Sequence, residues 1–340
     1  MMEKRIEYID SIRGLAIFLV VMGHVIAWNY GDWQQICVFS PSQPKSYWVG
    51  GVVWQVIYSF HMALFFMVSG FLSGVSLVSR ENIFRKIWKK TERLFIPYIV
   101  TTGLVLVAGS NHVYWFLLSL FEISLVGFLL LMLLRIFWRG NEPNIYVDLF
   151  VFGFMYLLLR VSTLSSCFSF IDAGVVKYFI PFTFGMLMRR HKWIERVVAG
   201  KHTFSFCFLI YMLLFASRYL PDCPQLYIWI FKIDFYFSVF SLLACILVFN
   251  IFMNGINPRL LGVLSYLGKI SLPIYILHIL FVVRLPVVGH WMLNQPMMTA
   301  VTLQVVYCAI LSGIAIVLCV LSYKLLCRSW IIKKLVFGES

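Results

Sequence analysis

The sequence predicts an all-α protein, a bundle of about ten helices that span a membrane. Its 340 residues are 61% hydrophobic and 12% charged, whereas soluble domains average roughly 45–50% apolar and roughly 25% charged residues. The mean hydropathy of +0.90 leaves too little polar surface to cover a water-soluble core. Lipid admits only helices and closed barrels, and the apolar stretches lack the alternation of barrel strands. This composition excludes disordered, collagen-like, coiled-coil and soluble nucleic-acid-binding proteins.

Ten apolar stretches are long enough to cross a bilayer, which takes about 20 residues in a helix. They run approximately over 12–29, 50–78, 94–110, 114–138, 145–164, 173–190, 203–220, 229–253, 260–288 and 298–326. The first stretch lacks a small-residue cleavage site, which argues against a removable signal peptide. The third is short and begins near Pro97. We expect one membrane domain over residues 1–340, with no internal repeat and no appended soluble domain.

The lysines and arginines predict how these helices are oriented. Of the 28 basic side chains, 22 fall in alternate loops and at the two ends of the chain. Because cytoplasmic loops carry the excess of basic residues, we expect both termini in the cytoplasm and a multi-pass protein of the inner membrane. The same asymmetry accounts for most of the net charge of +14, so no nucleic-acid partner is expected.

The eight cysteines predict neither a disulfide framework nor a metal site. No C-x-x-C pair and no Cys/His spacing typical of zinc occurs. Three cysteines fall in loops that we expect on the outer side, where one disulfide is an open alternative: Cys37, Cys167 and Cys223. Four others lie inside apolar stretches and are expected to be small buried hydrophobic residues: Cys207, Cys245, Cys308 and Cys319.

Four titratable side chains are predicted to lie at one depth of the bundle. His24, His61, Glu122 and His278 each lie three or four residues outward of the centre of their stretch, about 4–6 Å above the midplane. Ionisable groups inside a membrane are costly and often functional, so we expect a shared polar chamber. The alternative for each histidine is a hydrogen bond to a neighbouring backbone or hydroxyl group.

The first stretch sets an arginine and a histidine on one helix face. Arg13 and His24 are 11 residues apart, which is about 16 Å of helix and nearly a whole number of turns. A ligand that arrives from the cytoplasm can meet Arg13 with its anionic part and His24 with its reactive end. A neutral imidazole there is a competent general base. The alternative for Arg13 is an anchor at the membrane interface.

The second stretch ends in small residues and is followed by a basic cluster. Ser69 and Gly70 allow close approach of helices, which serves packing or makes room for a ligand chain. The basic residues that follow can bind anionic lipid or hold the phosphates of a nucleotide-bearing donor, and the pattern fits both. This cluster consists of Arg80, Arg85, Lys86, Lys89, Lys90 and Arg93.

Taken together, these motifs resemble the membrane acyltransferase family three, bacterial integral-membrane enzymes that acylate surface sugars. The run from Tyr8 to His24 matches the first family motif, an arginine followed after ten residues by a histidine. The run from Phe60 to Phe71 resembles the second motif, and is closest to the fucose 4-O-acetylase-like branch, in which a proline usually replaces Ala63. Further likenesses are Arg93 to Tyr98, His112 to Leu117, Phe182 to Gly185 and Leu267 to His278. The likeness covers essentially the whole chain.

The resemblance implies an acyl-coenzyme A donor, commonly acetyl-coenzyme A, taken from the cytoplasmic side. It implies a hydroxyl of a cell-surface or lipid-linked glycan as acceptor, catalysis by His24, and donor binding or site support by Arg13. We expect Glu122, His61 or His278 to orient the imidazole. Donor contacts are further expected from the basic cluster, Ser69 and Tyr275, and an acceptor contact from Trp115. No metal is expected, and direct transfer and an acyl-enzyme both stay open.

Two other classes stay open at this point. A transporter could move glycans or small anions through the same chamber, but the two halves of the sequence show no matching broken helices. A structural or regulatory module with an inactive site is the third class. The joint presence of Arg13, His24, Ser69 and Tyr275 argues against it.

Overall fold

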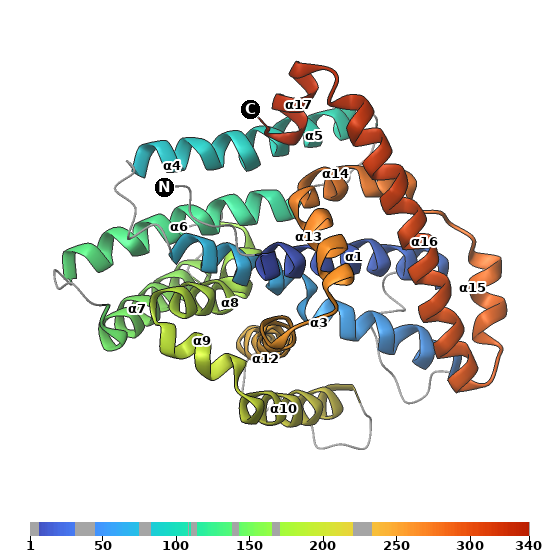
Figure 1. The fold of residues 1–340 in the computed structure, drawn as a ribbon, viewed down its shortest axis with the longest axis horizontal. Coiled ribbons are helices and arrows are strands. Elements are labelled where there is room, and N and C mark those ends of the chain that lie inside the picture. Colours follow the sequence, from blue (N-terminus) through green and yellow to red (C-terminus); the bar gives the residue numbers. More distant parts are fainter. Residues whose placement is uncertain are drawn as a thin grey trace.

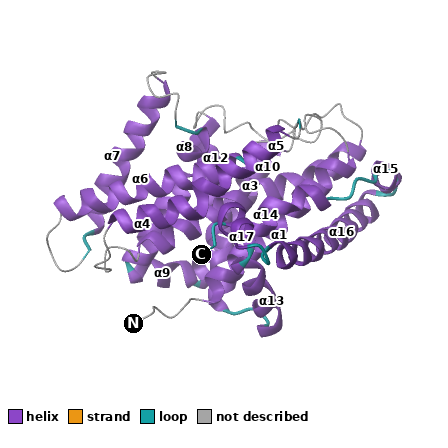
Figure 2. Ribbon diagram, turned by 90° about the horizontal axis from the view of Figure 1, so that it is seen from above, coloured by secondary structure: helices purple, strands orange, loops and turns teal. Residues whose placement is uncertain are grey.

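A computed structural model describes residues 7–30, 45–74, 83–107, 109, 114–137, 143–164, 171–219 and 233–339. Within those ranges every regular element is a helix and no strand is present, as Figure 2 shows. The predicted all-α fold is therefore confirmed. The loops that hold Cys37, Cys167 and Cys223 lie outside the described residues.

Each predicted apolar stretch overlaps a helix of the structure (Figure 1). The first eight elements are α1 (Glu7–Tyr30), α3 (Lys45–Gly74), α4 (Ile83–Lys90), the π-helical turn η2 (Thr91–Phe95), α5 (Ile96–Val107), α6 (Trp115–Phe137), α7 (Ile145–Leu164) and α8 (Ala173–Arg190). The chain continues with α9 (Lys192–Ala199), α10 (Lys201–Tyr219), α12 (Ile233–Asn254), α13 (Pro258–Lys269), α14 (Ser271–Phe281), α15 (Pro286–Leu293), α16 (Met297–Leu326) and α17 (Trp330–Phe337).

The lengths and composition of these helices define a multi-pass membrane protein. Six of the described helices are long and apolar enough to cross a membrane, namely α1, α3, α6, α7, α12 and α16. The number rises to eight if the bent pairs α9–α10 and α13–α14 each form one span. The expected count of ten stays a prediction, because α5 has only 12 residues and α8 carries three basic side chains in 18 residues.

Large apolar side chains face outward on the peripheral helices. Examples are Phe150 and Leu157 on α7, Leu213 on α10, and Ile310 and Leu321 on α16, each more than half exposed. In water such a surface would be an aggregation hazard, whereas lipid tails solvate it without cost. The exposed apolar belt therefore agrees with the composition of the chain.

The ninth apolar stretch, 260–288, is not one straight helix. It divides into α13 and α14, which are bent by 83° at Ile270. Pro273 lies in the first turn of α14, where its missing N–H has no intrahelical partner to lose. The depth predicted for His278 assumed an unbroken span, so that argument does not hold for this residue.

Helices α1 and α13 pack through two glycines. A Cβ atom on Gly14 would lie 1.9 Å from the carbonyl oxygen of Leu264, and one on Gly268 would lie 1.8 Å from that of Asp10. Any larger residue would collide with backbone at either position. The contact is the means by which the start of α14 is brought beside α1.

Helices α3 and α8 approach in the same way. A Cβ atom on Gly70 would lie 1.8 Å from the carbonyl oxygen of Phe182, and one on Gly185 would lie 2.0 Å from that of Met67. Small residues permit such close contact of helix backbones in membranes. The packing interpretation of the small residues at the end of α3 therefore applies to Gly70.

We predict that Gly185→Ala lowers the stability of the protein by about 1–3 kcal/mol, as overpacking usually does. The added methyl group meets the backbone of α3, which cannot rotate away. The matched control is Gly313→Ala in α16, because a Cβ atom there would have no neighbour within 4 Å. Thermal unfolding in detergent should show a lower midpoint for Gly185→Ala alone, and equal midpoints for both variants would contradict the prediction.

Candidate active site

A pocket of about 420 Å³ opens between α1, α3, α4, η2, α6 and α14. Its volume lies within the range of ~300–1,000 Å³ that is usual for small-molecule sites. Five basic side chains, three serine hydroxyls and a set of apolar and aromatic residues line it. The basic residues are Arg13, Lys86, Lys89, Lys90 and Arg93, and the serines are Ser69, Ser73 and Ser271.

Most of the pocket's positive charge comes from one continuous face of α4 and η2. Lys86, Lys89, Lys90 and Arg93 are spaced by three, one and three residues, which places them on the same side of a helix. Helices α4 and α5 lie almost in line in Figure 1, joined by the π-helical turn η2. Turns of this kind are often found at functional sites.

Arg13 reaches the pocket from α1 and is held from two sides. Its Nη2 donates a hydrogen bond to Ser271 Oγ at 3.0 Å, and its Nη1 lies 3.9 Å from Asp10 Oδ1. Ser271 begins α14, so the packing of α13 on α1 positions the partner of Arg13. A half-buried guanidinium with this geometry is suited to bind a phosphate or carboxylate group.

The four basic side chains of α4 and η2, Lys86, Lys89, Lys90 and Arg93, form what we call the basic wall of the pocket. Lys90 is half-buried in it. Burial, together with the positive charges of Arg93 and Arg13, lowers the pKa of its ammonium group to about 8. Like charges gathered in one place disfavour the charged form of each. An anionic ligand at this end of the pocket would relieve the repulsion.

Ser69 lies in the pocket wall with an unsatisfied hydroxyl group. Its Oγ is buried and forms no hydrogen bond with any other residue in the described part of the chain. Its backbone carbonyl accepts a hydrogen bond from Ser73 Oγ at 2.8 Å. Since a buried hydroxyl without a partner is costly, the Ser69 hydroxyl is a candidate contact for a polar group of a bound ligand.

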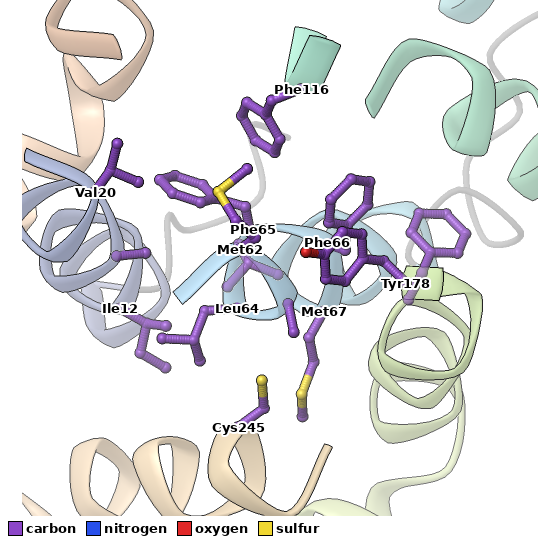
Figure 3. Close-up of a cluster of buried hydrophobic side chains, with 14 of the residues drawn as sticks. Ile12, Val20, Met62, Leu64, Phe65, Phe66, Met67, Phe116, Tyr178 and Cys245 are labelled. Atoms are coloured by element: carbon purple, nitrogen blue, oxygen red, sulfur yellow. The ribbon is translucent and has the colours of Figure 1, made fainter. Parts of the chain in front are cut away.

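Three of the aromatic rings that line the pocket lie next to one another. Phe116 lies between the other two, with its ring centroid 5.2 Å from that of Phe65 and 5.2 Å from that of Tyr275. Figure 3 shows Phe65 directed toward Val20 of α1, while Phe66 stacks on Tyr178 at 4.6 Å. The motifs at the end of α3 and at the start of α6 thus supply adjoining parts of the wall.

Beyond Tyr275 lie two histidines in contact. The ring of Tyr275 is 5.8 Å from that of His278, and the His278 ring is 4.9 Å from that of His24 in an edge-to-face arrangement. His278 is buried and His24 is half-buried. The structure therefore brings His24 and His278 together, one ring beyond the residues that line the pocket.

All three predicted histidines place Nδ1 next to a carbonyl oxygen of the preceding turn. The distances are 2.9 Å from His24 to Val20, 2.8 Å from His61 to Ile57 and 2.7 Å from His278 to Tyr275. A carbonyl only accepts, so Nδ1 must be the donor, and in the neutral ring Nε2 keeps its lone pair. The backbone contacts expected as the alternative reading are therefore present, and they leave Nε2 of His24 suited to act as a base.

The other two members of the predicted layer form contacts of their own. His61 is buried with its ring 4.6 Å from that of Tyr58. Glu122 Oε2 accepts a hydrogen bond from the backbone N–H of Asp172 at 2.9 Å, and Asp172 caps the start of α8. The Glu122 carboxylate thus supports the start of α8, and its role in orienting the imidazole stays a prediction.

The remaining predicted site residues do not line the pocket or lie outside the described residues. Arg85 is exposed on α4 and is not among the pocket residues, while Arg80 lies outside the described ranges. Trp115 is 38% exposed and stacks on Tyr178 at 6.5 Å. No group of three or more potential metal ligands occurs among the described side chains, and the four cysteines of the apolar stretches are free and buried there.

Several pocket residues were missed from the sequence. Ser271 was overlooked because a bend at Ile270, which brings it to Arg13, cannot be seen in an apolar stretch. Phe65 and Phe116 lie in two of the motifs and could have been chosen as wall residues, since Ser69 follows Phe65 by one helical turn.

The C-terminal helix supports the basic wall from behind. Gly338, which caps α17 with φ of +62°, packs against η2 so closely that a Cβ atom there would lie 2.7 Å from Arg93 Cα. Phe337 is fully buried, and Tyr323 donates a hydrogen bond to Glu339 at 2.7 Å. This segment fixes the backbone position from which Arg93 reaches the pocket.

A pocket lined by basic side chains on a helical membrane scaffold suits a membrane enzyme with a charged cosubstrate. The family model described as "Acyltransferase domain", that of acyltransferase family 3, matches residues 6–112 and 106–324. The two matches cover most of the chain, so the protein belongs to this family of membrane acyltransferases. No curated protein and no solved structure matches it.

The pKa of Lys90 predicts a pH dependence for binding at the basic wall. Affinity for coenzyme A, the donor carrier that the resemblance implies, should fall as the pH rises through about 8, because Lys90 loses its charge there. In the Lys90→Arg variant, which stays charged, the affinity should remain constant to about pH 10. Equilibrium binding to the detergent-solubilised protein between pH 6 and about pH 10 would show both, and parallel curves would refute the assignment.

The contact of Gly338 with η2 predicts a second effect on the same binding. Gly338→Ala should weaken coenzyme A binding several-fold by displacing Arg93. Gly255→Ala is the matched control, because Gly255 also has a positive φ, of +104°, but no neighbour within 4 Å of a Cβ atom. Both variants place an alanine at a positive φ, the less favourable one being that of Gly255, so an equal change in dissociation constant would show that α17 has no role in the wall.

Proposed function

We propose that the protein transfers an acyl group, most simply acetyl, from acyl-coenzyme A to a hydroxyl of a cell-surface or lipid-linked glycan. The donor enters from the cytoplasmic side of the inner membrane, with both termini on that side. The family supplies the reaction class. The observation that carries the proposal is that five basic side chains and Tyr275 line one pocket, and that the rings of His278 and His24 follow next to Tyr275.

The basic end of the pocket suits the phosphates of coenzyme A. Arginine forks and lysine ammonium groups are the usual partners of phosphate oxygens. The apolar wall beyond them, with Phe65 and Leu72 among its residues, suits the thin chain that carries the thioester. Its amide groups would find a partner in the Ser69 hydroxyl, which the protein leaves unsatisfied among the described residues.

His24 is the proposed general base. Its Nε2 would take the proton of the acceptor hydroxyl as that oxygen attacks the thioester carbonyl carbon, and the carbon–sulfur bond then breaks. The imidazolium returns the proton to the departing thiolate, so that ester and free coenzyme A are formed and the enzyme is unchanged. His278 would hold the ring of His24 in place through their edge-to-face contact.

The test is the loss of transfer without the loss of donor binding. In membranes given radiolabelled acetyl-coenzyme A, His24→Ala should reduce incorporation of label by at least about 100-fold, as removal of a general base usually does. Its affinity for coenzyme A should stay unchanged. His202→Ala is the matched control, because His202 is exposed at the start of α10.

The same experiment separates the proposal from its alternatives. Near-normal incorporation by His24→Ala would remove His24 from the mechanism. Wild-type protein that fails to bind coenzyme A but moves glycans or small anions across vesicle membranes would establish a transporter. Assignment to the fucose 4-O-acetylase-like branch remains a prediction, which the structure of the acylated product would decide.

A further inference from the structure

The far side of His24 from the pocket is formed by the end of α1 and the loop between α14 and α15. Along α1, His24 lies about 16 Å from Arg13, and Trp28 lies about 6 Å further in the same direction. The pocket contains Arg13, so Trp28 marks the opposite approach to the histidine. Under the proposed function this is the side from which the acceptor would come.

A positive charge is held at this approach. The guanidinium carbon of Arg284 lies 4.1 Å from the centroid of the Trp28 ring, and the Trp28 ring lies 5.9 Å from that of His24. These two contacts place the guanidinium within about 10 Å of the imidazole. Arg284 is exposed, and no acidic residue in the described part of the chain forms an ion pair with it.

The position of Arg284 is fixed by a buried amide. Asn29, which is fully buried, donates from Nδ2 to the carbonyl of Val283 at 2.9 Å, and its Oδ1 accepts from the backbone N–H of Leu285 at 2.7 Å. The two hydrogen bonds bracket Arg284 on either side. A second bond from Nδ2 to Val25 within α1, at 2.8 Å, ties the amide to its own helix.

Arg284 differs from an ordinary surface arginine, because its position is fixed before any ligand binds. A buried side chain that forms hydrogen bonds with the backbone on both sides of a residue holds that residue in place. Less conformational entropy is then lost when the residue binds a ligand. The indole face below the guanidinium restricts it further and leaves its N–H edges open. Those edges match the oxygen atoms of a carboxylate or phosphate.

We propose that Arg284 binds an anionic group of the acceptor, and that the protein therefore acylates an anionic glycan. The carboxylate or phosphate would lie on the same sugar as the reacting hydroxyl or on its neighbour, because the guanidinium and the imidazole are so close. Asn29 and Trp28 act as positioning residues for Arg284. This inference rests on the proposed function.

The experiment uses inverted membrane vesicles from cells that make the wild-type protein, Arg284→Gln or Arg160→Gln. Arg160 is the control, since it lies on α7, which packs against α6 and α8. The vesicles are given radiolabelled acetyl-coenzyme A, and the labelled glycan is measured and applied to an anion-exchange column. Coenzyme A binding is measured on each purified protein.

We expect the wild-type product to be retained by the column. Arg284→Gln should lower its yield by at least about tenfold, the usual effect of losing a charge-assisted hydrogen bond. Arg160→Gln should leave the yield unchanged, and both variants should bind coenzyme A as the wild type does.

Two outcomes would overturn the inference alone. One is full labelling by Arg284→Gln. The other is a neutral product, even if its yield falls in the variant, because Arg284 would then serve a lipid headgroup or the fold. If the wild type labels no glycan at all, the proposed function itself fails, and this result is distinct from the first two.

Discussion

Close contact between helix backbones is the constraint on which the site depends. Gly14 and Gly268 let α13 lie against α1, and Gly70 and Gly185 let α3 lie against α8. Without a hydrophobic force to drive helices together in lipid, such contacts and their van der Waals packing hold the bundle. The first pair brings Ser271 to Arg13, and the second fixes the helix whose end supplies Ser69 to the pocket.

Much of the fold could be predicted from the sequence, because hydropathy and charge are properties of each segment alone, and they decide whether that segment can lie in lipid. Every predicted apolar stretch overlaps a helix, and the early motifs contribute Arg13, Ser69 and Arg93 to one pocket. The bend at Ile270 could not be predicted, because an apolar stretch looks the same in a straight helix and in a broken one.

In the predicted four-residue layer, Glu122 forms its hydrogen bond at the start of α8, and this has a related cause. Depth along a helix follows from residue number, but the direction in which a side chain points into the bundle depends on how the helices are rotated against each other. His24 and His278 share both depth and direction, so their rings meet. Glu122 on α6 points to the start of α8, where Asp172 provides a backbone N–H.

The contact between Gly338 and the turn that holds Arg93 joins the last described helix to a segment made much earlier in the chain. During synthesis α4, η2 and α5 would enter the membrane long before α17 emerges from the ribosome. The basic wall would then stay incomplete until α17 has docked. The final position of the Arg93 backbone would thus be set late in synthesis, by a segment more than 200 residues further along the chain.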